Sequence, residues 1–144
     1  MSLVTRWSSW GPQLHAVLRI VAAFMFLLSG TTKLFGVPHA APPHDATVPW
    51  MSQAGIGGIL EAVGGLLMLV GLFARPVAFI LSGEMAVAYW QFHFPQGFWP
   101  NINGGMPAVL YCFLWLYYSA AGAGPWSLDA RRGRAGPAAA GVRT

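Results

Sequence analysis

Charged residues are scarce in this chain of 144 residues. Only 8% of them are Asp, Glu, Lys or Arg, against about 25% in an ordinary soluble domain, whereas 56% are hydrophobic. A domain of this size leaves a large fraction of its surface exposed, so a soluble fold could not hide so much apolar area. We therefore expect the chain to lie in a lipid bilayer.

Cysteine is also nearly absent. Cys112 is the single cysteine, which excludes an intramolecular disulfide, a Cys-rich metal site and a CxxC redox mechanism within the chain. The sequence has no phosphate-binding loop, dinucleotide-binding fingerprint or Ser–His–Asp order. His39, His44 and Asp45 share one loop, but their spacing matches no common metal-ligand motif, so we expect no metal site.

Basic residues are confined to a few segments. Residues 131–144 hold four arginines, and no folded basic face accompanies them, so we expect no nucleic-acid partner. The stretches 36–54 and 93–106 contain no Lys or Arg, whereas Arg6, Arg75 and the C-terminal tail are basic. The positive-inside rule then predicts that both termini are cytoplasmic and that the two longer loops lie outside.

Four apolar segments contain most of the hydrophobic residues. Each is near the ~20 residues that cross about 30 Å of hydrocarbon as a helix, the last two being somewhat short. The first is too long for a typical signal peptide and is expected to be retained. The predicted helices cover about 12–35, 55–73, 76–92 and 107–121. We expect an all-α, four-helix transmembrane bundle over 1–130, followed by a basic, disordered cytoplasmic tail over 131–144.

Glycine recurs along the second apolar segment. Gly57, Gly64 and Gly71 are seven residues apart, and Gly58 and Gly65 repeat the same step. This spacing places small residues along one face of the helix, where another helix can approach closely. A general enrichment of glycine in membrane helices is the alternative explanation, but the heptad recurrence favours packing.

Four ionisable residues fall inside the apolar segments: Arg19, Lys33, Glu61 and Glu84. Such residues are costly in lipid and usually face a partner or a polar cavity. At a rise of about 1.5 Å per residue, Arg19 and Glu84 both lie roughly 10–12 Å from the inner face, which predicts a buried ion pair between them. Glu61 lies roughly 9 Å below the outer face, near Lys33, whose side chain can bend inward or snorkel outward.

Polar residues are expected around the outer pair. His93, Asn101 and Asn103 fall at the same level as Lys33 and Glu61. One interpretation is that the charges only lock the helices in register, since a buried pair seldom adds much net stability. The other is that these five residues form a cavity for a small amphipathic ligand. Lys33 and Glu61 would then orient its polar head, and His93 would relay a proton.

Several stretches, taken together, resemble the DoxX family of small four-helix membrane proteins. They are "LRIVAAFMFLLSGTTKLFG", "EAVGGLLMLVGLFARP", "FWPNINGGMPAVLY" and "GAGPWSLDA", in this order, over about residues 14–130. The family commonly reads NGGE where this chain has Met106. Chemistry that requires a second outer carboxylate at that position is therefore not expected here.

The resemblance implies a role in a membrane system and not a stand-alone enzyme. One family member is a subunit of a thiosulfate:quinone oxidoreductase, and others are associated with oxidative-stress defence. We expect a multi-pass protein of the bacterial inner membrane, acting as an accessory subunit of a redox system. Its ligand would be a quinone or another lipophilic molecule, with no covalently bound cofactor.

Two kinds of protein contact are compatible with this role, a partner subunit or further copies of the chain. A function of a different class is left open by the sequence. The protein would then be a non-catalytic assembly factor or carrier, and its buried charges would only fasten the helices.

Overall fold

The computed structural model describes residues 3–39 and 46–135, and within these ranges every regular element is a helix. The described helices are α1 (Leu3–Ser8), α2 (Gly11–Phe35), α3 (Gln53–Val70), α4 (Ala74–Ala88), the π-helical turn η1 (Tyr89–His93), the 3-10 turn η2 (Phe94–Gln96), α5 (Met106–Ala121) and α6 (Leu128–Ala135). The prediction of an all-α fold is confirmed.

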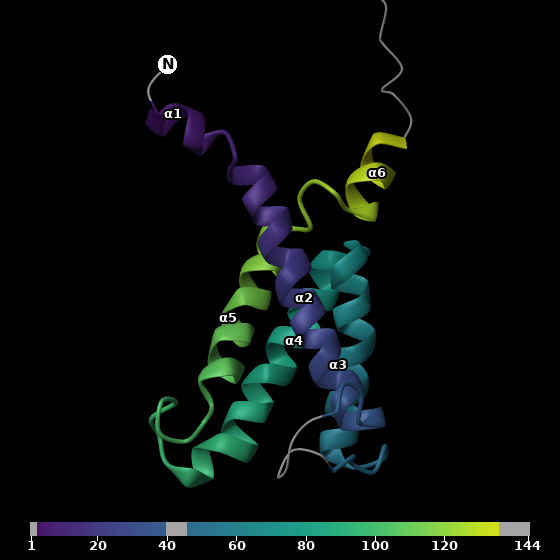
Figure 1. Ribbon diagram of the computed structural model, residues 1–144, viewed down its shortest axis with the longest axis vertical. Helices are drawn as coiled ribbons and strands as arrows, with labels where there is room; N and C mark the ends of the chain where they lie inside the picture. The colour runs from purple at the N-terminus through teal and green to yellow at the C-terminus, as the bar shows by residue number, and fades with distance from the viewer. Residues whose placement is uncertain (1–2, 40–45, 136–144) are drawn as a thin grey trace, which may run out of the picture.

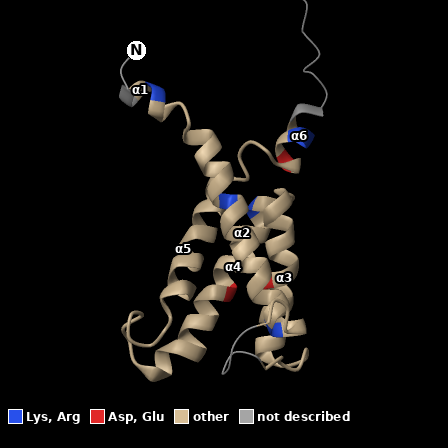
Figure 2. Cartoon of the chain, viewed as in Figure 1, with Lys and Arg blue, Asp and Glu red and all other residues tan. Residues whose placement is uncertain are grey.

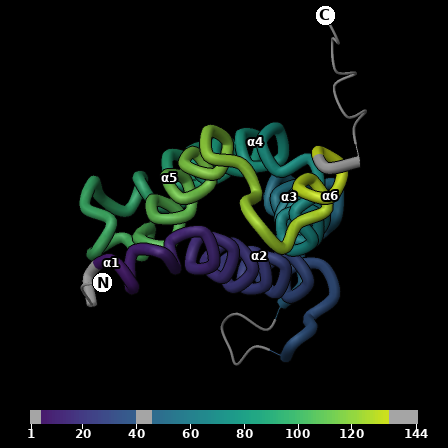
Figure 3. The backbone as a smooth tube through the Cα atoms, turned by 90° about the horizontal axis from the view of Figure 1, so that it is seen from above, coloured from purple at the N-terminus to yellow at the C-terminus, as the bar shows by residue number. Residues whose placement is uncertain are grey.

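The long helices α2, α3, α4 and α5 lie alongside one another (Figure 1). Backbone contacts join α2 to α3, α3 to α4, and α4 to α5. Aromatic side chains join α5 back to α2, because Phe26 packs against Tyr111 and Trp115. The short helices α1 and α6 lie at the same end of the molecule, and Figure 3 shows α6 over the end of α3.

Local sequence signals set the ends of these helices. Pro12 occupies the first turn of α2, where a missing N–H costs no helical hydrogen bond. Ser52 begins α3, and its Oγ accepts a hydrogen bond from the N–H of Gly55 at 3.0 Å. Gly36 and Gly71 end α2 and α3 with φ of 66° and 67°, a left-handed conformation that glycine adopts readily.

The helices begin and end close to the predicted bounds, with three differences. The helix predicted over about 76–92 is α4 up to Ala88 and then the π-helical turn η1. α3 covers Gln53–Val70 instead of about 55–73, because Ser52 caps its start and Gly71 stops it. The tail predicted to be disordered from residue 131 begins inside α6, and residues 136–144 lie outside the described residues.

The repeated glycines of α3 face two neighbouring helices and not one. A Cβ on Gly65 would lie 2.8 Å from the backbone nitrogen of Leu27 in α2, whereas a Cβ on Gly64 would lie 2.6 Å from the side chain of Leu81 in α4. Residues 57–58 repeat this division, the first facing α4 and the second facing α2. The four glycines at 57, 58, 64 and 65 therefore serve packing, and together they let α3 approach two helices at once. Gly71, the last member of the first series, ends α3, and a Cβ there would meet Ser127 and Arg19.

The outer surfaces of the long helices are apolar. Large hydrophobic side chains are exposed on all of them, for example Val21, Val63, Phe79 and Leu110. α2 and α3 are long and apolar enough to cross a membrane, and α5 is a shorter apolar helix. A soluble monomer rarely exposes so much contiguous apolar surface, whereas lipid tails impose no penalty on it.

Gly30 marks the tightest approach between α2 and α3. A Cβ at this position would lie 2.4 Å from the backbone nitrogen of Ala62, which can move only with its helix. We predict that Gly30→Ala lowers the thermal midpoint of the purified protein in detergent, with the loss of roughly 1–3 kcal/mol that overpacking causes. Gly83→Ala is the matched control, since nothing lies within 4 Å of its Cβ position. Equal midpoints for the two variants would contradict the close contact.

Candidate functional site: a cavity beside a buried ion pair

An ion pair joins α2 to α3 inside the molecule. Lys33 Nζ lies 2.6 Å from Glu61 Oε1, and Ser29 Oγ donates to Glu61 Oε2 at 3.0 Å. Glu61 is only 2% exposed, whereas the side chain of Lys33 is 39% exposed. The predicted contact between Lys33 and Glu61 is therefore present. The third member, Ser29, lies one turn before Lys33 on the same face of α2, a spacing that the sequence shows.

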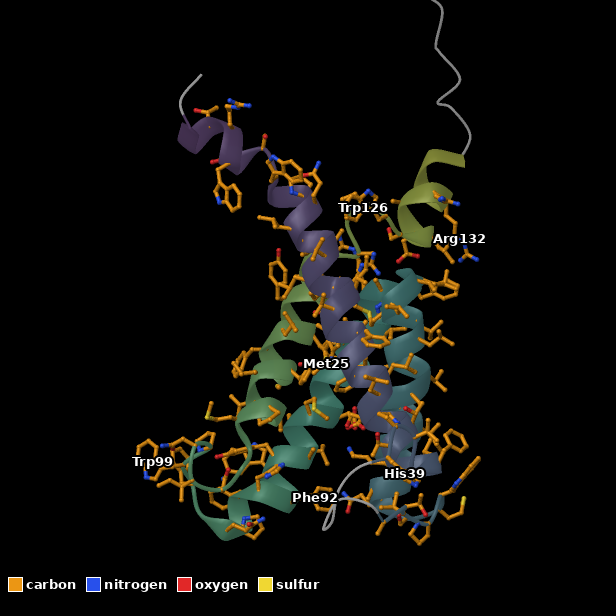
Figure 4. All side chains as sticks on the ribbon, viewed as in Figure 1. Met25, His39, Phe92, Trp99, Trp126 and Arg132 are labelled. Atoms are coloured by element: carbon orange, nitrogen blue, oxygen red, sulfur yellow. The ribbon has the colours of Figure 1, made fainter. Side chains whose placement is uncertain are left out.

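A cavity of about 480 Å³ opens beside this pair, between α3 on one side and α4 with η1 on the other. Its lining residues are Lys33, Gln53, Ala54, Ile56, Gly57, Leu60, Ile80, Glu84, Val87, Ala88, Phe92 and His93. Figure 4 shows Phe92 at the same end of the molecule as His39 and Trp99. A mostly apolar wall with a few polar groups is typical of a site for a small molecule.

Glu84 lies in the wall of this cavity, at a level close to that of Glu61. Its Oε1 would be 3.2 Å from a Cβ on Gly57, which precedes Glu61 by one helical turn. Its Oε2 is buried and has no hydrogen-bond partner among the described residues. Figure 2 shows the acidic residues of α3 and α4 at similar heights, far from the acidic residue of α6. Two carboxyl groups are thus close to one cavity.

The predicted ion pair between Arg19 and Glu84 is wrong. Arg19 is fully buried, and its guanidinium donates hydrogen bonds to backbone carbonyls and not to a carboxylate. The acceptors are Met68 and Leu69 in the last turn of α3, and Ala123 and Trp126 in the segment after α5. Arg19, which lies on α2, therefore links the C-terminal end of α3 to the segment that follows α5.

The length of α2 explains this difference. Its first turns extend beyond the ends of α3 and α5 (Figure 1), so a residue count from its start does not give a depth among the other helices. Arg19 consequently lies level with the last turn of α3, where the final carbonyls have no partner within the helix. A guanidinium, with five donors and a positive charge, satisfies these carbonyls and complements the negative end of the helix dipole.

Among the other predicted ligand-binding residues, only His93 lines the cavity. Its Nδ1 lies 3.1 Å from the carbonyl oxygen of Asn103. The side chain of Asn103 holds the loop together, because Nδ2 donates to the Gly97 carbonyl at 2.7 Å and Oδ1 accepts from the N–H of Gly105 at 2.8 Å. Asn101 is exposed. Neither amide contributes to the cavity wall.

Metal ligands do not gather in the part of the chain that the structure describes. No three His, Cys, Asp or Glu residues there could hold a metal ion together. His39 Nδ1 contacts the carbonyl oxygen of Gly36 at 3.0 Å. The two other loop residues considered above, His44 and Asp45, lie outside the described residues.

The opposite end of the molecule is closed by α6. Asp129 accepts hydrogen bonds from the N–H groups of Phe73 at 2.9 Å and Ala74 at 2.8 Å, so it caps α4 from a distant part of the chain. The guanidinium of Arg132 lies 5.0 Å from the centre of the Phe73 ring. Figure 4 places Trp126 and Arg132 together at this end. These contacts fix α6 against the turn between α3 and α4.

Comparison with known proteins decides the family. The DoxX family model matches residues 14–94, which is more than half of the chain and includes Lys33, Glu61, Glu84 and His93. The chain belongs to the DoxX family. Together with the two helices long enough to cross a bilayer, this membership makes the DoxX-family chain a membrane protein.

A relative extends the similarity over most of the DoxX-family chain. An uncharacterized protein of Haemophilus influenzae is 44% identical over 123 residues, which cover 82% of this chain and 90% of the relative. No solved structure shows significant similarity. The family is therefore established, whereas the chemistry of the cavity has to be argued from its residues.

Double-mutant cycles test whether Lys33 pairs with Glu61 and whether Arg19 and Glu84 are independent of each other. We predict a coupling energy of about 0.5–3 kcal/mol between Lys33→Met and Glu61→Gln, because the two side chains are in contact. Arg19→Gln and Glu84→Gln should be additive within about 0.5 kcal/mol, since they share no partner. Unfolding free energies in mixed detergent and SDS supply the values. A coupling in the second cycle as large as in the first would contradict the structure.

Arg19→Lys tests whether charge alone fastens the end of α3. A lysine offers its donors from a single nitrogen and cannot reach carbonyls on two segments as the guanidinium fork does. We predict a lower thermal midpoint, because each buried carbonyl left without a donor costs about 1–3 kcal/mol. Arg6→Lys in the exposed helix α1 is the matched control and should leave the midpoint unchanged. An Arg19→Lys variant with the thermal midpoint of the wild type would contradict the role of the guanidinium hydrogen bonds.

Proposed function

We propose that this DoxX-family membrane protein is an accessory subunit of a redox system that binds a quinone or another lipophilic ligand. The observation that carries the proposal is the cavity between α3 and α4, whose volume of about 480 Å³ is in the usual range for small-molecule sites. Ile80 and Val87 would contact the ring and tail, while Lys33, Glu84 and His93 would meet the polar head.

The proposal includes a topology in the bacterial inner membrane. In it, α2, α3, α4 with η1, and α5 each cross the bilayer, and both termini are cytoplasmic. Arg6, Arg131 and Arg132 support this orientation, because they lie on α1 and α6 at one end of the molecule (Figure 2). α4 (15 residues) continues directly into η1 (5 residues), which gives a span of roughly 30 Å. The cavity would then face the outer half of the membrane.

Within this function the chain would hold the ligand, and a partner subunit would exchange electrons with it. His93 is suited to move the accompanying proton. Since the carbonyl oxygen of Asn103 can only accept, His93 Nδ1 carries the hydrogen of that contact, and Nε2 of the neutral ring is left as an acceptor. Glu61 accepts hydrogen bonds from Lys33 and Ser29 and would hold the ammonium group of Lys33 in position for the ligand.

A non-catalytic assembly factor or carrier is the second candidate function, and one observation favours it. Lys33, Ser29 and Glu61 satisfy one another across α2 and α3 without any ligand. Breaking such a buried pair is costly even where its net contribution to stability is small. In this alternative the pair only fastens the two helices, and the exposed aromatic residues Trp90 and Trp99 would recruit the partner protein.

Mass spectrometry of solvent extracts from the purified protein tests the proposed function. We predict about one quinone per wild-type chain. Ala54→Trp should remove it, because the indole would fill the cavity that Ala54 lines. Ile59→Trp is the matched control, since Ile59 is partly exposed on the same helix outside the cavity wall. A ligand-free wild type that co-purifies with another polypeptide would favour the assembly factor or carrier.

Cysteine labelling tests the topology. Asn101 and Arg131 are exposed at opposite ends of the molecule and can each be replaced by cysteine in a Cys112→Ser background. We predict that a membrane-impermeant maleimide labels Asn101→Cys in intact cells but labels Arg131→Cys only after permeabilisation. The reverse pattern would contradict the proposed orientation, and equal labelling in intact cells would contradict a membrane barrier between the two positions.

A further inference from the structure

A second cavity, of about 470 Å³, lies at the end of the molecule that carries α6. It lies between the start of α4 and the segment 121–130, and its wall includes Arg75, Gly122 and Asp129. We propose that this inner cavity binds the phosphate group of an anionic phospholipid from the leaflet at this end, the cytoplasmic leaflet in the proposed topology. The inference goes beyond the proposed redox function, because it concerns a different cavity and a different ligand.

Arg75 supplies the hydrogen-bond donors of this site. Its Nη1 donates to the carbonyl oxygens of Ser119 and Ala120 near the end of α5, which fixes the guanidinium between α4 and α5. Its Nε and Nη2 have no hydrogen-bond partner among the described residues. These two nitrogens form one edge of the planar group, and such an edge can donate to two oxygens of a phosphate at once. Arg75 is thus a positioned bidentate donor.

The glycine at position 122 keeps this edge of the guanidinium uncovered. A Cβ there would lie 3.3 Å from Nη2 and 3.4 Å from Nε of Arg75. Gly122 belongs to the cavity wall and has a φ of 80°, a conformation that glycine adopts readily. The two nitrogens without partners are therefore next to the cavity.

The charges around the inner cavity favour an anion. Figure 2 shows most of the basic residues at this end of the molecule. The guanidinium of Arg132 lies 5.0 Å from the centre of the Phe73 ring, and Phe73 belongs to the cavity wall.

Asp129 is the acidic residue of the wall, but both of its oxygens accept hydrogen bonds from N–H groups at the start of α4. Within the part of the chain that the structure describes, Asp129 forms no ion pair with Arg75. Arg75 and Arg132 therefore outweigh one carboxylate that is already engaged. The positive balance favours a head whose only charge is that of the phosphate over a head that also carries an ammonium group.

An apolar surface begins beside Arg75 and leads away from the cavity. Phe79, one helical turn after Arg75 on the same face of α4, is 65% exposed. Leu116, one turn before Ala120 in α5, is 44% exposed. In the proposed topology these side chains face the hydrocarbon of the bilayer, so a phospholipid can place its phosphate on Arg75 and its acyl chains on this surface. A soluble phosphate ester has no part that matches it.

Native mass spectrometry of the full chain, released from detergent micelles, tests the inference. The probes are dioleoyl phosphatidylglycerol and dioleoyl phosphatidylcholine, which share their acyl chains and the phosphate. We expect the wild type to bind phosphatidylglycerol about fivefold more tightly, the effect of one net basic residue on an anionic head. Arg75→Gln should weaken phosphatidylglycerol about tenfold and remove the preference, because the charge-assisted hydrogen bonds are lost. Arg6→Gln is the matched control, since it removes an exposed charge on α1 outside the cavity wall and should change neither value.

Three results would overturn the inference. They are equal binding of the two lipids by the wild type, the same phosphatidylglycerol affinity in Arg75→Gln as in Arg6→Gln, and an inorganic phosphate adduct without a lipid adduct, which would assign the site to a soluble phosphate. If Arg75→Gln does not yield folded protein, Arg75→Lys takes its place. Lysine keeps the charge but lacks the planar edge, so we expect a several-fold loss of affinity, and an unchanged affinity would contradict the bidentate contact.

Discussion

Lipid tails offer no hydrogen bonds, so every polar group of a helix in a bilayer has to find its partner within the protein. Arg19 meets this constraint by donating to the last carbonyls of α3 and to the chain after α5. Glu61 meets it through Lys33 and Ser29. Glu84 leaves one buried oxygen without a partner, and this oxygen belongs to a residue of the cavity wall. Trp115 Nε1 is also buried without a partner among the described residues, but Trp115 does not line the cavity. Of these two groups, Glu84 is therefore the one that a ligand in the cavity could meet, and this supports the proposed function.

Close packing of α3 makes this arrangement possible. Its two series of glycines allow α2 to approach from one side and α4 from the other. Lys33 and Glu84 consequently line one cavity, although they lie on helices separated by α3 in the sequence. Larger residues at these positions would push the helices apart and would separate the charges as well. Packing and chemistry are thus set by the same small residues.

The sequence predicted those parts of the structure that depend on local pattern. The apolar runs gave the helices, and the matching levels of Lys33 and Glu61 gave their contact. Depth counted along each helix failed for Arg19, because α2 extends beyond its neighbours and the relative shift of two helices is a tertiary property. Asn103 was expected near a ligand, but the loop uses its amide for its own hydrogen bonds. Counting residues along a helix does not show which hydrogen-bond partner a side chain has in the folded protein.

Contacts over long sequence distances were the least predictable. Asp129 caps α4 from α6, and this pairing follows only from the position at which α6 folds back. Glu84 could be placed in the cavity only once the register of α4 against α3 was known, because a shift of one helical turn moves a side chain by about 5.4 Å. Fold class and helix order were therefore accessible from the sequence, whereas the composition of the site required the packing of the helices.

The role of Glu84 is the central claim, and infrared difference spectroscopy of the carboxyl region tests it most directly. The spectrum of the purified protein would be recorded before and after addition of decyl-1,4-benzoquinone. We expect a change in a carboxyl band in the wild type that is absent from Glu84→Gln, because the polar head of the ligand would contact that side chain. A change that persists unaltered in Glu84→Gln would show that another carboxyl group meets the ligand and would contradict the assignment.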